Sequence, residues 1–558
     1  MNNYFLITIV VSVLLFTGCQ KDLDLIPKDT ISDATFWKSA TDYKLAANNL
    51  YYSLEDFKYS MDTESDIAFD VPNSFSNGSY QTSETDSKWS DPYVYIRRCN
   101  NIIEKAEESI IANDIEQFVA EAKFFRAYNY WKLFRLYGGV PLIKQVLNLN
   151  SEELYAPRAT RKETVELIIS DLTAAAASLP EQKNSSNEDV GRITKGAVNA
   201  LKARVALFEG TWEKFRNGED ANTYLNIAIE AATTVMNGNQ YSLFTDKGEQ
   251  SYRYMFIEPG DDASEAILGR RHHRDIEGST YNRWVSEGGY LITKKLADMY
   301  LSKDGLPITQ SALFQGYNTC VSEFQDRDPR MSMTMIIPGT PVAQTWYPTE
   351  PVESWPFYPQ RNANTGYTTY KYLSEDEYAN SVNHNWSYDH HIIRYAEVLL
   401  IYAEAIFEKN GEISDADLDK SINLIRQRVN MPAITNAFVI ANGLDMRTEI
   451  RRERTVELAL EGLRYDDLRR WKTAEIELPQ AIRGIKIVGT PWVDPIIVEG
   501  ANRNPYGEDN WQNNTDANGF IIVESESGRT FDPQKNYLRP IPTKQILIND
   551  KLKQNPEW

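Results

Sequence analysis

The chain is poor in cysteine, histidine and positive charge, and each shortage narrows the classes of protein to which it can belong. It has 3 cysteines and 5 histidines among 558 residues. A chain of this size needs no disulfide framework, so we interpret Cys99 and Cys320 as free core cysteines, with a disulfide as the less favoured alternative. The formal net charge of −20 argues against nucleic acid and against docking on anionic lipid. It fits a solvated protein that binds a neutral ligand.

Long apolar runs are also missing, apart from one at the N-terminus. After Cys19 no apolar stretch approaches 18 residues, so we expect no membrane-spanning helix there. Residues 6–16 form an apolar run of eleven. As a helix such a run spans roughly 16 Å, about half of a bilayer core. That length suits the apolar part of a signal peptide.

The apolar run leads into Leu15-Phe16-Thr17-Gly18-Cys19, which resembles the bacterial lipobox, although no Lys or Arg precedes it. We therefore predict a lipoprotein signal peptide over residues 1–18, an acyl (palmitate) anchor on Cys19 and a lipidated tether over residues 19–30. An ordinary secretory signal is the alternative. The charged residues Lys21, Asp22 and Asp24 resemble the surface-export signal of Bacteroidetes lipoproteins. They favour the outer membrane, with the protein facing the cell exterior.

Helical periodicity dominates both ends of the mature chain. The N-terminal region, residues 31–240, contains predicted helices over residues 41–54, 93–106, 115–137, 164–179, 194–212 and 224–236. The C-terminal region, residues 392–558, contains predicted helices over residues 392–407, 416–429 and 446–471, followed by an irregular tail. Between them, residues 241–391 are rich in Gly, Pro, Asn, Tyr and Trp and lose this periodicity. We interpret that region as loop-rich and ligand-binding, because long loops are usually functional or mobile.

Small residues on the predicted helices indicate close helix packing, for example at Ala197, Ala200, Ala203 and Ala206. Residues 394–428 read as helix, turn and helix over about 34 residues, the length of a tetratricopeptide repeat. The expected fold is therefore mainly α, an α-solenoid platform of tetratricopeptide-like helix pairs with a loop-rich irregular insertion.

Several segments in order along the mature chain together resemble the SusD/RagB family of outer-membrane nutrient-binding lipoproteins. They are FRAYNYW at 125–131, LYGGVPL at 136–142, RYAEVLL at 394–400, YAEA at 402–405, INLIRQR at 422–428, RRER at 451–454, EGLRYDDLRRW at 461–471 and LRPIP at 538–542. The resemblance implies four tetratricopeptide-like helix pairs and a SusC-like, TonB-dependent β-barrel partner. It also implies binding of an oligosaccharide, or less often a peptide, without catalysis.

A sugar-binding site needs flat aromatic faces and polar groups, and we expect these outside the regular helices. In the family, the region before the helix at Tyr93 often supplies a stacking aromatic, which makes Trp89 the first candidate. Any one aromatic is more often a core residue than a ligand contact. The other candidates are Asp66, Tyr80 and Asn100 nearby, and Trp284, Tyr290, Trp346 and Trp355 in the middle region.

Other conspicuous patterns have structural interpretations. Glu449, Glu453, Glu457 and Glu461 lie on one helix face, and Arg452, Arg454 and Arg464 are placed three residues away to offset their repulsion. We expect a networked helix face there. Gly138-Gly139 is interpreted as a helix stop, because no phosphate-loop pattern accompanies it.

Neither cofactor nor metal is expected. Adjacent histidines such as His390-His391 point in different directions, and the sequence has no HExxH or CxxC motif, which disfavours zinc. Residues 514–519 resemble the first half of a calcium loop, but Ser525 stands where the loop needs Glu. A turn is favoured there, and calcium is the less favoured alternative.

Four functions remain from the sequence. The leading hypothesis is a non-catalytic glycan-binding surface lipoprotein that delivers its ligand to a SusC-like transporter. The alternatives are a peptide or other nutrient binder on the same scaffold, a glycoside hydrolase, and a purely structural repeat scaffold. The 79 acidic residues supply many carboxylate pairs, so their presence does not identify a hydrolase.

Overall fold

The computed structural model describes residues 36–57, 62–182, 189–286, 289–337, 365–376, 386–493 and 514–558. The predicted signal peptide, tether and anchor residue Cys19 lie outside the described residues, as do Trp346 and Trp355. Within the described ranges, no helix combines the length and apolar character that crossing a membrane requires. Cys99 and Cys320 are both free.

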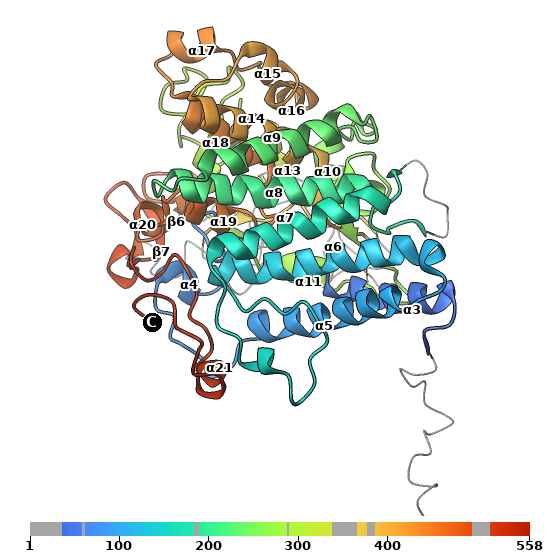
Figure 1. The fold of residues 1–558 in the computed structure, drawn as a ribbon. Helices are drawn as coiled ribbons and strands as arrows, with labels where there is room; N and C mark the ends of the chain where they lie inside the picture. Colours follow the sequence, from blue (N-terminus) through green and yellow to red (C-terminus); the bar gives the residue numbers. More distant parts are fainter. Residues whose placement is uncertain are drawn as a thin grey trace, which may run out of the picture.

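A layer of long helices forms one side of the molecule, with successive helices packed against each other (Figure 1). Helices that follow each other along the chain therefore lie side by side, which confirms the predicted mainly α fold of tetratricopeptide-like helix pairs. The layer comprises α3 (Ala40–Leu50), α5 (Ser87–Glu107), α6 (Ala112–Tyr137), α7 (Arg161–Ser178), α8 (Lys195–Lys214), α9 (Ala221–Asn237) and α14 (Tyr395–Asn410).

Local signals explain where these helices begin and end. Thr160 caps α7 in a capping box with Glu163, whose carboxylate accepts from the Thr160 N–H at 2.7 Å. Gly138 ends α6 with φ +75° and ψ −134°, a conformation that favours glycine, so the predicted stop is confirmed. The one large boundary error is at α5, which begins at Ser87 rather than at Tyr93.

The small residues of α8 allow close approach to its neighbours. Ala197, Ala200, Ala203 and Ala206 are buried, as the sequence predicts. A Cβ on Gly210 would lie 2.9 Å from Leu225 Cγ, so α9 packs directly on the α8 backbone. The helical layer and the start of the C-terminal region share one hydrophobic cluster.

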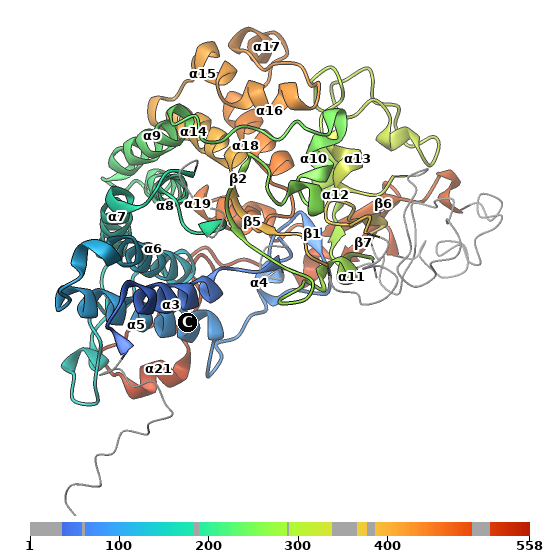
Figure 2. The same ribbon diagram turned by 90° about the vertical axis from the view of Figure 1, so that its right-hand side faces the viewer.

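The loop-rich middle region lies on the opposite side and builds a second hydrophobic cluster (Figure 2). Aromatic residues of that region, including Tyr252, Tyr281, Trp386 and Tyr388, are buried in it. Three small antiparallel sheets accompany it: β1 (Ala68–Phe69) with β3 (Leu291–Ile292) and β4 (Tyr367–Thr368), β2 (Ala266–Arg270) with β5 (His390–Arg394), and β6 (Ile482–Lys486) with β7 (Phe520–Glu524).

Short helices complete the described fold. They are α4 (Ser74–Asn77), α10 (Ser251–Tyr254), α11 (Tyr281–Ser286), α12 (Lys294–Met299), α13 (Arg330–Thr334), α15 (Asp415–Asp419), α16 (Ile422–Arg428), α17 (Asn436–Ala441), α18 (Met446–Glu457), α19 (Arg464–Arg470), α20 (Ala474–Glu477) and α21 (Thr543–Ile548).

The predicted helix over residues 446–471 is wrong as one element. It is broken between α18 and α19, where Leu460 and Gly462 have φ of +65° and +76°. The carboxylate of Asp62 accepts from the backbone N–H of Arg464 at 2.8 Å and of Gly462 at 3.2 Å, which stabilises the start of α19. The helix predicted over 392–407 likewise begins as β5, and the one over 416–429 divides into α15 and α16.

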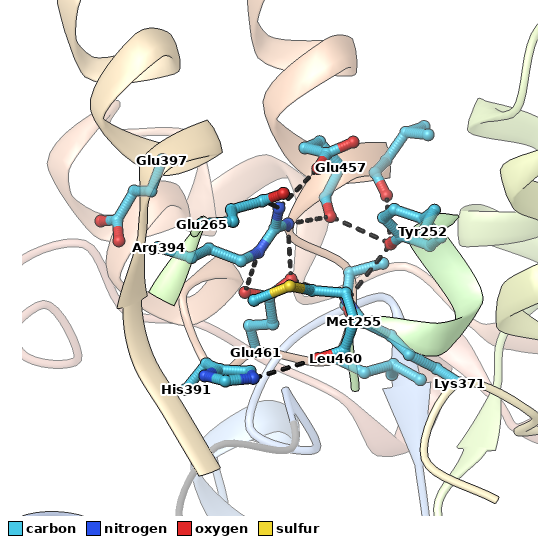
Figure 3. Close-up of polar contacts among 12 residues, drawn as sticks. Tyr252, Met255, Glu265, Lys371, His391, Arg394, Glu397, Glu457, Leu460 and Glu461 are labelled. Atoms are coloured by element: carbon cyan, nitrogen blue, oxygen red, sulfur yellow. Dashed lines mark hydrogen bonds and ion pairs between the residues drawn. The ribbon is translucent and has the colours of Figure 1, made fainter. Parts of the chain in front are cut away.

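The glutamates predicted to share one helix face belong to a buried ion network, so the interpretation as a networked face is confirmed. Figure 3 shows Arg394 of β5 directed at three carboxylates, with N–O distances of 2.7 Å to Glu265, 2.6 Å to Glu457 and 2.8 Å to Glu461. Lys371 reaches Glu461 at 2.7 Å. Arg330, Arg426 and Arg428 supply further cations to Glu453 and Glu457.

Two of the three predicted partner arginines are wrong. Arg452 does pair with Glu449 at 3.2 Å. Arg454 instead pairs with Asp467, and Arg464 with Asp66, both at 2.8 Å. The turn after α18 brings Asp467 of α19 to Arg454, and it places Arg464 against Asp66 from the N-terminal part of the chain.

Candidate ligand-binding groove

Two adjoining cavities lie at the end of α3. The larger is bordered by α3, residues 190–192 and the end of β2, and the smaller by the start of α5 and the end of α6. One has a volume of about 540 Å³ and the other about 330 Å³. Both are lined by Tyr52, Leu54 and Arg270, so they adjoin each other, and we call the two together the Tyr52 groove. Tyr52 belongs to the 3-10 helix η1 (Tyr51–Ser53), which continues α3. A concave surface of this size with aromatic and polar walls is the usual form of a ligand site.

Aromatic rings are exposed on the walls of this groove. Tyr52 is 60% exposed at the junction of the two cavities. It lies off the buried stripe of α3, which consists of Tyr43, Ala47 and Leu50. Tyr95 of α5 is half-buried in the smaller cavity, with the Arg98 guanidinium 4.9 Å from its ring centroid. Such rings offer flat apolar faces with a polar tip.

Charged groups surround these rings and are held by the fold. The Lys132 ammonium donates to the Ser53 carbonyl oxygen at 3.0 Å, and Arg270 donates to the Leu54 carbonyl oxygen at 3.1 Å. Burial alone would raise the pKa of Glu55, but the charges of Arg135 and Lys132 outweigh it and keep that pKa below its ordinary value. Burial lowers the pKa of Lys132, although the Glu55 charge opposes this shift.

The structure gives structural partners to three candidates from the sequence. Trp89 is only 3% exposed, lies inside α5 rather than before it, and packs against Tyr93 and Tyr137. Asp66 is buried in its ion pair with Arg464. Because these groups face the interior, they offer no surface to a ligand in this conformation.

Asn100 is the third buried candidate. Its amide donates to the carbonyl oxygens of Ile143 and Gln145, both at 3.1 Å, and its oxygen accepts from Arg126 at 3.0 Å. It therefore holds the segment after α6 against α5. These contacts satisfy both the donors and the acceptor of the side chain.

The remaining described candidates are more exposed and lie outside the groove lining. Trp284 of α11 is 56% exposed. Tyr290 is half-buried and stacks on Tyr281, with 5.6 Å between the ring centroids. Tyr80 stacks on Phe75, with 4.0 Å between the ring centroids. The structure therefore does not bring the candidates from the sequence together into one cluster.

Sequence reasoning missed the residues that line the groove. Tyr52 had a usable signal, because it is an aromatic residue off the apolar stripe of its helix. Lys132 and Arg270 had none, since only the fold places them beside consecutive carbonyl groups of the chain at residues 53–54.

The residues of the calcium-like loop and of the adjacent histidine pair have structural roles. Asp516 accepts from the backbone N–H of Asn518 and Phe520 and pairs with Arg483 at 2.9 Å, so residues 514–519 form the predicted turn before β7. Burial lowers the pKa values of His390 and His391 to about 4. In the part of the chain that the structure describes, no His, Cys, Asp and Glu side chains gather as a metal site.

The fold defines a class of protein, namely a mainly α protein of tetratricopeptide-like helix pairs with an irregular second layer. Within this class, the chain belongs to the SusD family, whose sequence model matches residues 239–558. A second model, described as starch-binding associating with outer membrane, matches residues 31–207.

Individual proteins agree with this assignment over most of the chain. SusD-like protein P38 of Formosa agariphila is 26% identical, with 88% of this chain and 95% of that protein covered. A SusD-like protein of Bacteroides ovatus is 23% identical, with 84% and 82% covered. The crystal structure of a SusD-like carbohydrate binding protein from Bacteroides fragilis is 25% identical, with a TM-score of 0.75 and 93% of this chain and 100% of that chain covered.

Proposed function

We propose that this chain is a non-catalytic lipoprotein of the outer membrane, anchored through Cys19, that binds an oligosaccharide and delivers it to a SusC-like TonB-dependent transporter. Membership of the SusD family supports this proposal. The B. fragilis relative named for carbohydrate binding supports the ligand class, and the description of the N-terminal family model supports the membrane. The observation that carries the proposal is the exposed ring of Tyr52 between two adjoining cavities.

The Tyr52 groove has the features that sugar recognition requires. The rings of Tyr52 and Tyr95 provide faces against which the C–H surface of a pyranose can pack. Amide, ammonium and guanidinium groups around them can bond hydroxyl groups, among them Asn48 and Asn49 of α3. The exposed Trp284 is proposed as a further contact, and Tyr80, Tyr290, Trp346 and Trp355 remain predicted contacts.

Replacement of Tyr52 tests the site. In Tyr52→Ala we expect the purified protein to bind its glycan about fivefold to tenfold more weakly, because a stacking face that contributes roughly 1–1.4 kcal/mol is removed. Glycan-array screening followed by calorimetric titration measures this. Tyr155→Ala is the matched control, since Tyr155 is 48% exposed but lies outside the groove.

Other outcomes would select other functions. Unchanged affinity in Tyr52→Ala would remove this groove from the site. Binding of peptides but not glycans would select the peptide-binding alternative, and release of reducing sugar by the purified protein would select a hydrolase. Failure of any β-barrel transporter to co-purify would favour the structural scaffold.

A further inference from the structure

The charge of the Tyr52 groove is opposite to the charge of the whole chain. The chain carries a formal net charge of −20. The acidic side chains that line the groove are Glu55, Asp56, Asp91 and Glu277. The cationic side chains are more numerous, namely Lys44, Lys88, Lys132, Arg135, Arg192, Arg270 and Arg271. This local excess departs from the neutral ligand that the net charge of the chain favours.

All of these cations except Lys132 form an ion pair within the described fold. Arg192 pairs with the buried carboxylate of Glu121 at 2.6 Å. Arg135 pairs with Asp466 at 3.2 Å and with Glu55. Ion pairs of this kind hold the walls of the groove in place, and they leave little charge for a ligand.

Lys132 differs from these, because its ammonium forms no ion pair with a described residue. One of its three N–H donors is used by the Ser53 carbonyl oxygen. The neighbouring charges that act on it are Glu55 and Asp91 on the acidic side, and Arg135 and Arg270 on the basic side. The two remaining donors are available to a ligand or to water.

Arg270 brings a second cation to the same place. It donates to the Leu54 carbonyl oxygen, which follows directly after the Ser53 carbonyl that Lys132 contacts. It also forms an ion pair with Glu277, whose side chain is 46% exposed. A partly exposed pair of this kind contributes little, so a ligand anion can compete for Arg270. Lys132 from α6 and Arg270 from β2 therefore converge on η1 beside Tyr52. Two cations held together in a partly desolvated groove favour an anion between them.

We propose that the Tyr52 groove takes an anionic glycan, whose carboxylate or sulfate group lies against Lys132 and Arg270 while a sugar ring packs on Tyr52. The inference rests on the proposed glycan-binding function and names the ligand class of that site. Uronic acids and sulfate esters present the same chemistry to an ammonium and a guanidinium group, namely anionic oxygens that accept charge-assisted hydrogen bonds.

Matched glycan pairs test the charge directly. The purified full chain is titrated with polygalacturonate and its fully methyl-esterified twin, with chondroitin sulfate and desulfated chondroitin, and with neutral laminarin and amylopectin. We expect at least one charged member to bind about tenfold more tightly than its neutral or desulfated twin, since each charge-assisted bond is strong. Added salt should weaken this binding. The ester pair identifies a carboxylate and the desulfated pair identifies a sulfate.

Variants tie the preference to the two cations. Lys132→Gln and Arg270→Gln should each remove most of the preference for the charged twin, while Lys132→Arg should retain it. Lys409→Gln is the control, because Lys409 is exposed at the end of α14, away from the groove. Equal melting temperatures for Lys132→Gln and the parent exclude a folding defect.

The outcomes separate the two proposals. Binding of laminarin or amylopectin as tight as that of every charged probe, with weakening in Tyr52→Ala, would overturn the anionic assignment and leave the glycan-binding function standing. A preference for charge that persists in both Lys132→Gln and Arg270→Gln would also overturn it. Absence of binding to every glycan would overturn the proposed function itself.

Discussion

Asp62 is a buried carboxyl group whose protonation is tied to the start of α19. It accepts the backbone N–H of Gly462 and Arg464. Burial raises the pKa of Asp62 to about 7, and these hydrogen bonds only partly offset that effect. The folded state therefore binds more protons than the unfolded state between about pH 4 and about pH 7. Stability contributed by this group is present at acidic pH and is lost as the pH rises toward 7.

Asp62→Asn should remove this pH dependence. The amide oxygen can keep the shorter bond, from the Arg464 N–H, while the amide nitrogen replaces the oxygen that accepts the Gly462 N–H and loses that bond at every pH. Asn tolerates the positive φ of 29° at this position. As the pH rises from about 5 to about 8, the parent should lose about 2 kcal/mol of unfolding free energy that the variant does not lose. Urea denaturation at several pH values measures this gain.

Asp445→Asn is the matched control for Asp62→Asn. Asp445 caps α18 by accepting the Thr448 N–H at 2.9 Å. Burial opposes the shift, but this bond and the Thr448 hydroxyl keep the pKa of Asp445 below its ordinary value. Its contribution is therefore present at neutral pH and lost in acid. A parallel pH dependence in the two variants would contradict the assignment at Asp62.

Residue roles were predictable from sequence where the partner is close along the chain. The Asp445 cap and the Arg452–Glu449 pair depend on residues three positions away, and both are present. The burial of Trp89 was not predictable, because the ring that covers it belongs to Tyr137 on the next helix.

At the scale of elements, the Gly138-Gly139 stop brings two stretches of backbone together. A Cβ on Gly139 would lie 2.1 Å from the Ala159 carbonyl oxygen and 2.9 Å from the carbonyl carbon of Thr160. Ala159 also donates its N–H to the Val140 carbonyl oxygen at 3.1 Å. This close approach and the hydrogen bond from Ala159 to Val140 together fix the spacing between the end of α6 and the start of α7.

Gly139→Ala should destabilise the protein by about 3 kcal/mol, because the obstructing atoms are backbone and cannot rotate away. Thermal unfolding of the full chain measures it. Gly411→Ala at the end of α14 is the comparison: it has φ +79° but no atom within 4 Å of the added Cβ, so only conformational strain of about 1 kcal/mol applies. Equal losses in the two variants would contradict the close approach at Gly139.

Elements with local start and stop signals were predictable, and elements shaped by distant contacts were not. The helix predicted over residues 115–137 matches α6 to within three residues at its start and none at its end. The helix predicted over 446–471 fails because Asp62, roughly 400 residues earlier, binds the backbone at its break. Periodicity alone carries no information about such a partner.

At the scale of the whole molecule, α18 joins the two hydrophobic clusters. Ile450 packs in the cluster of the helical layer, and Val456 packs in the cluster of the irregular layer. The buried ion network around Arg394 lies at the same junction. Its carboxylates come from Glu265 of the middle region and from Glu457 and Glu461 of the C-terminal region. The charge lining the Tyr52 groove is a property of this scale too, because its cations come from α3, α5, α6, the loop before α8, and the end of β2 with the residue after it.

Arg394→Met should destabilise the protein by about 3 kcal/mol, because three buried carboxylates, Glu265, Glu457 and Glu461, each lose one cation. Each keeps a second cation, from Arg428, Arg330 or Lys371, which holds the loss at the lower end of the range for a broken buried pair. Arg447→Met is the control: its side chain is 38% exposed and pairs with Glu408 at 2.9 Å, and Glu408 keeps Lys214 as a partner. Glu408 is buried, but it is still neutralised by Lys214 after the change, and Arg447 is partly exposed, so we expect a loss of only about 1 kcal/mol. Urea denaturation of both variants decides the matter, since a loss in Arg394→Met no larger than that in Arg447→Met would mean that the network does not hold the two layers together.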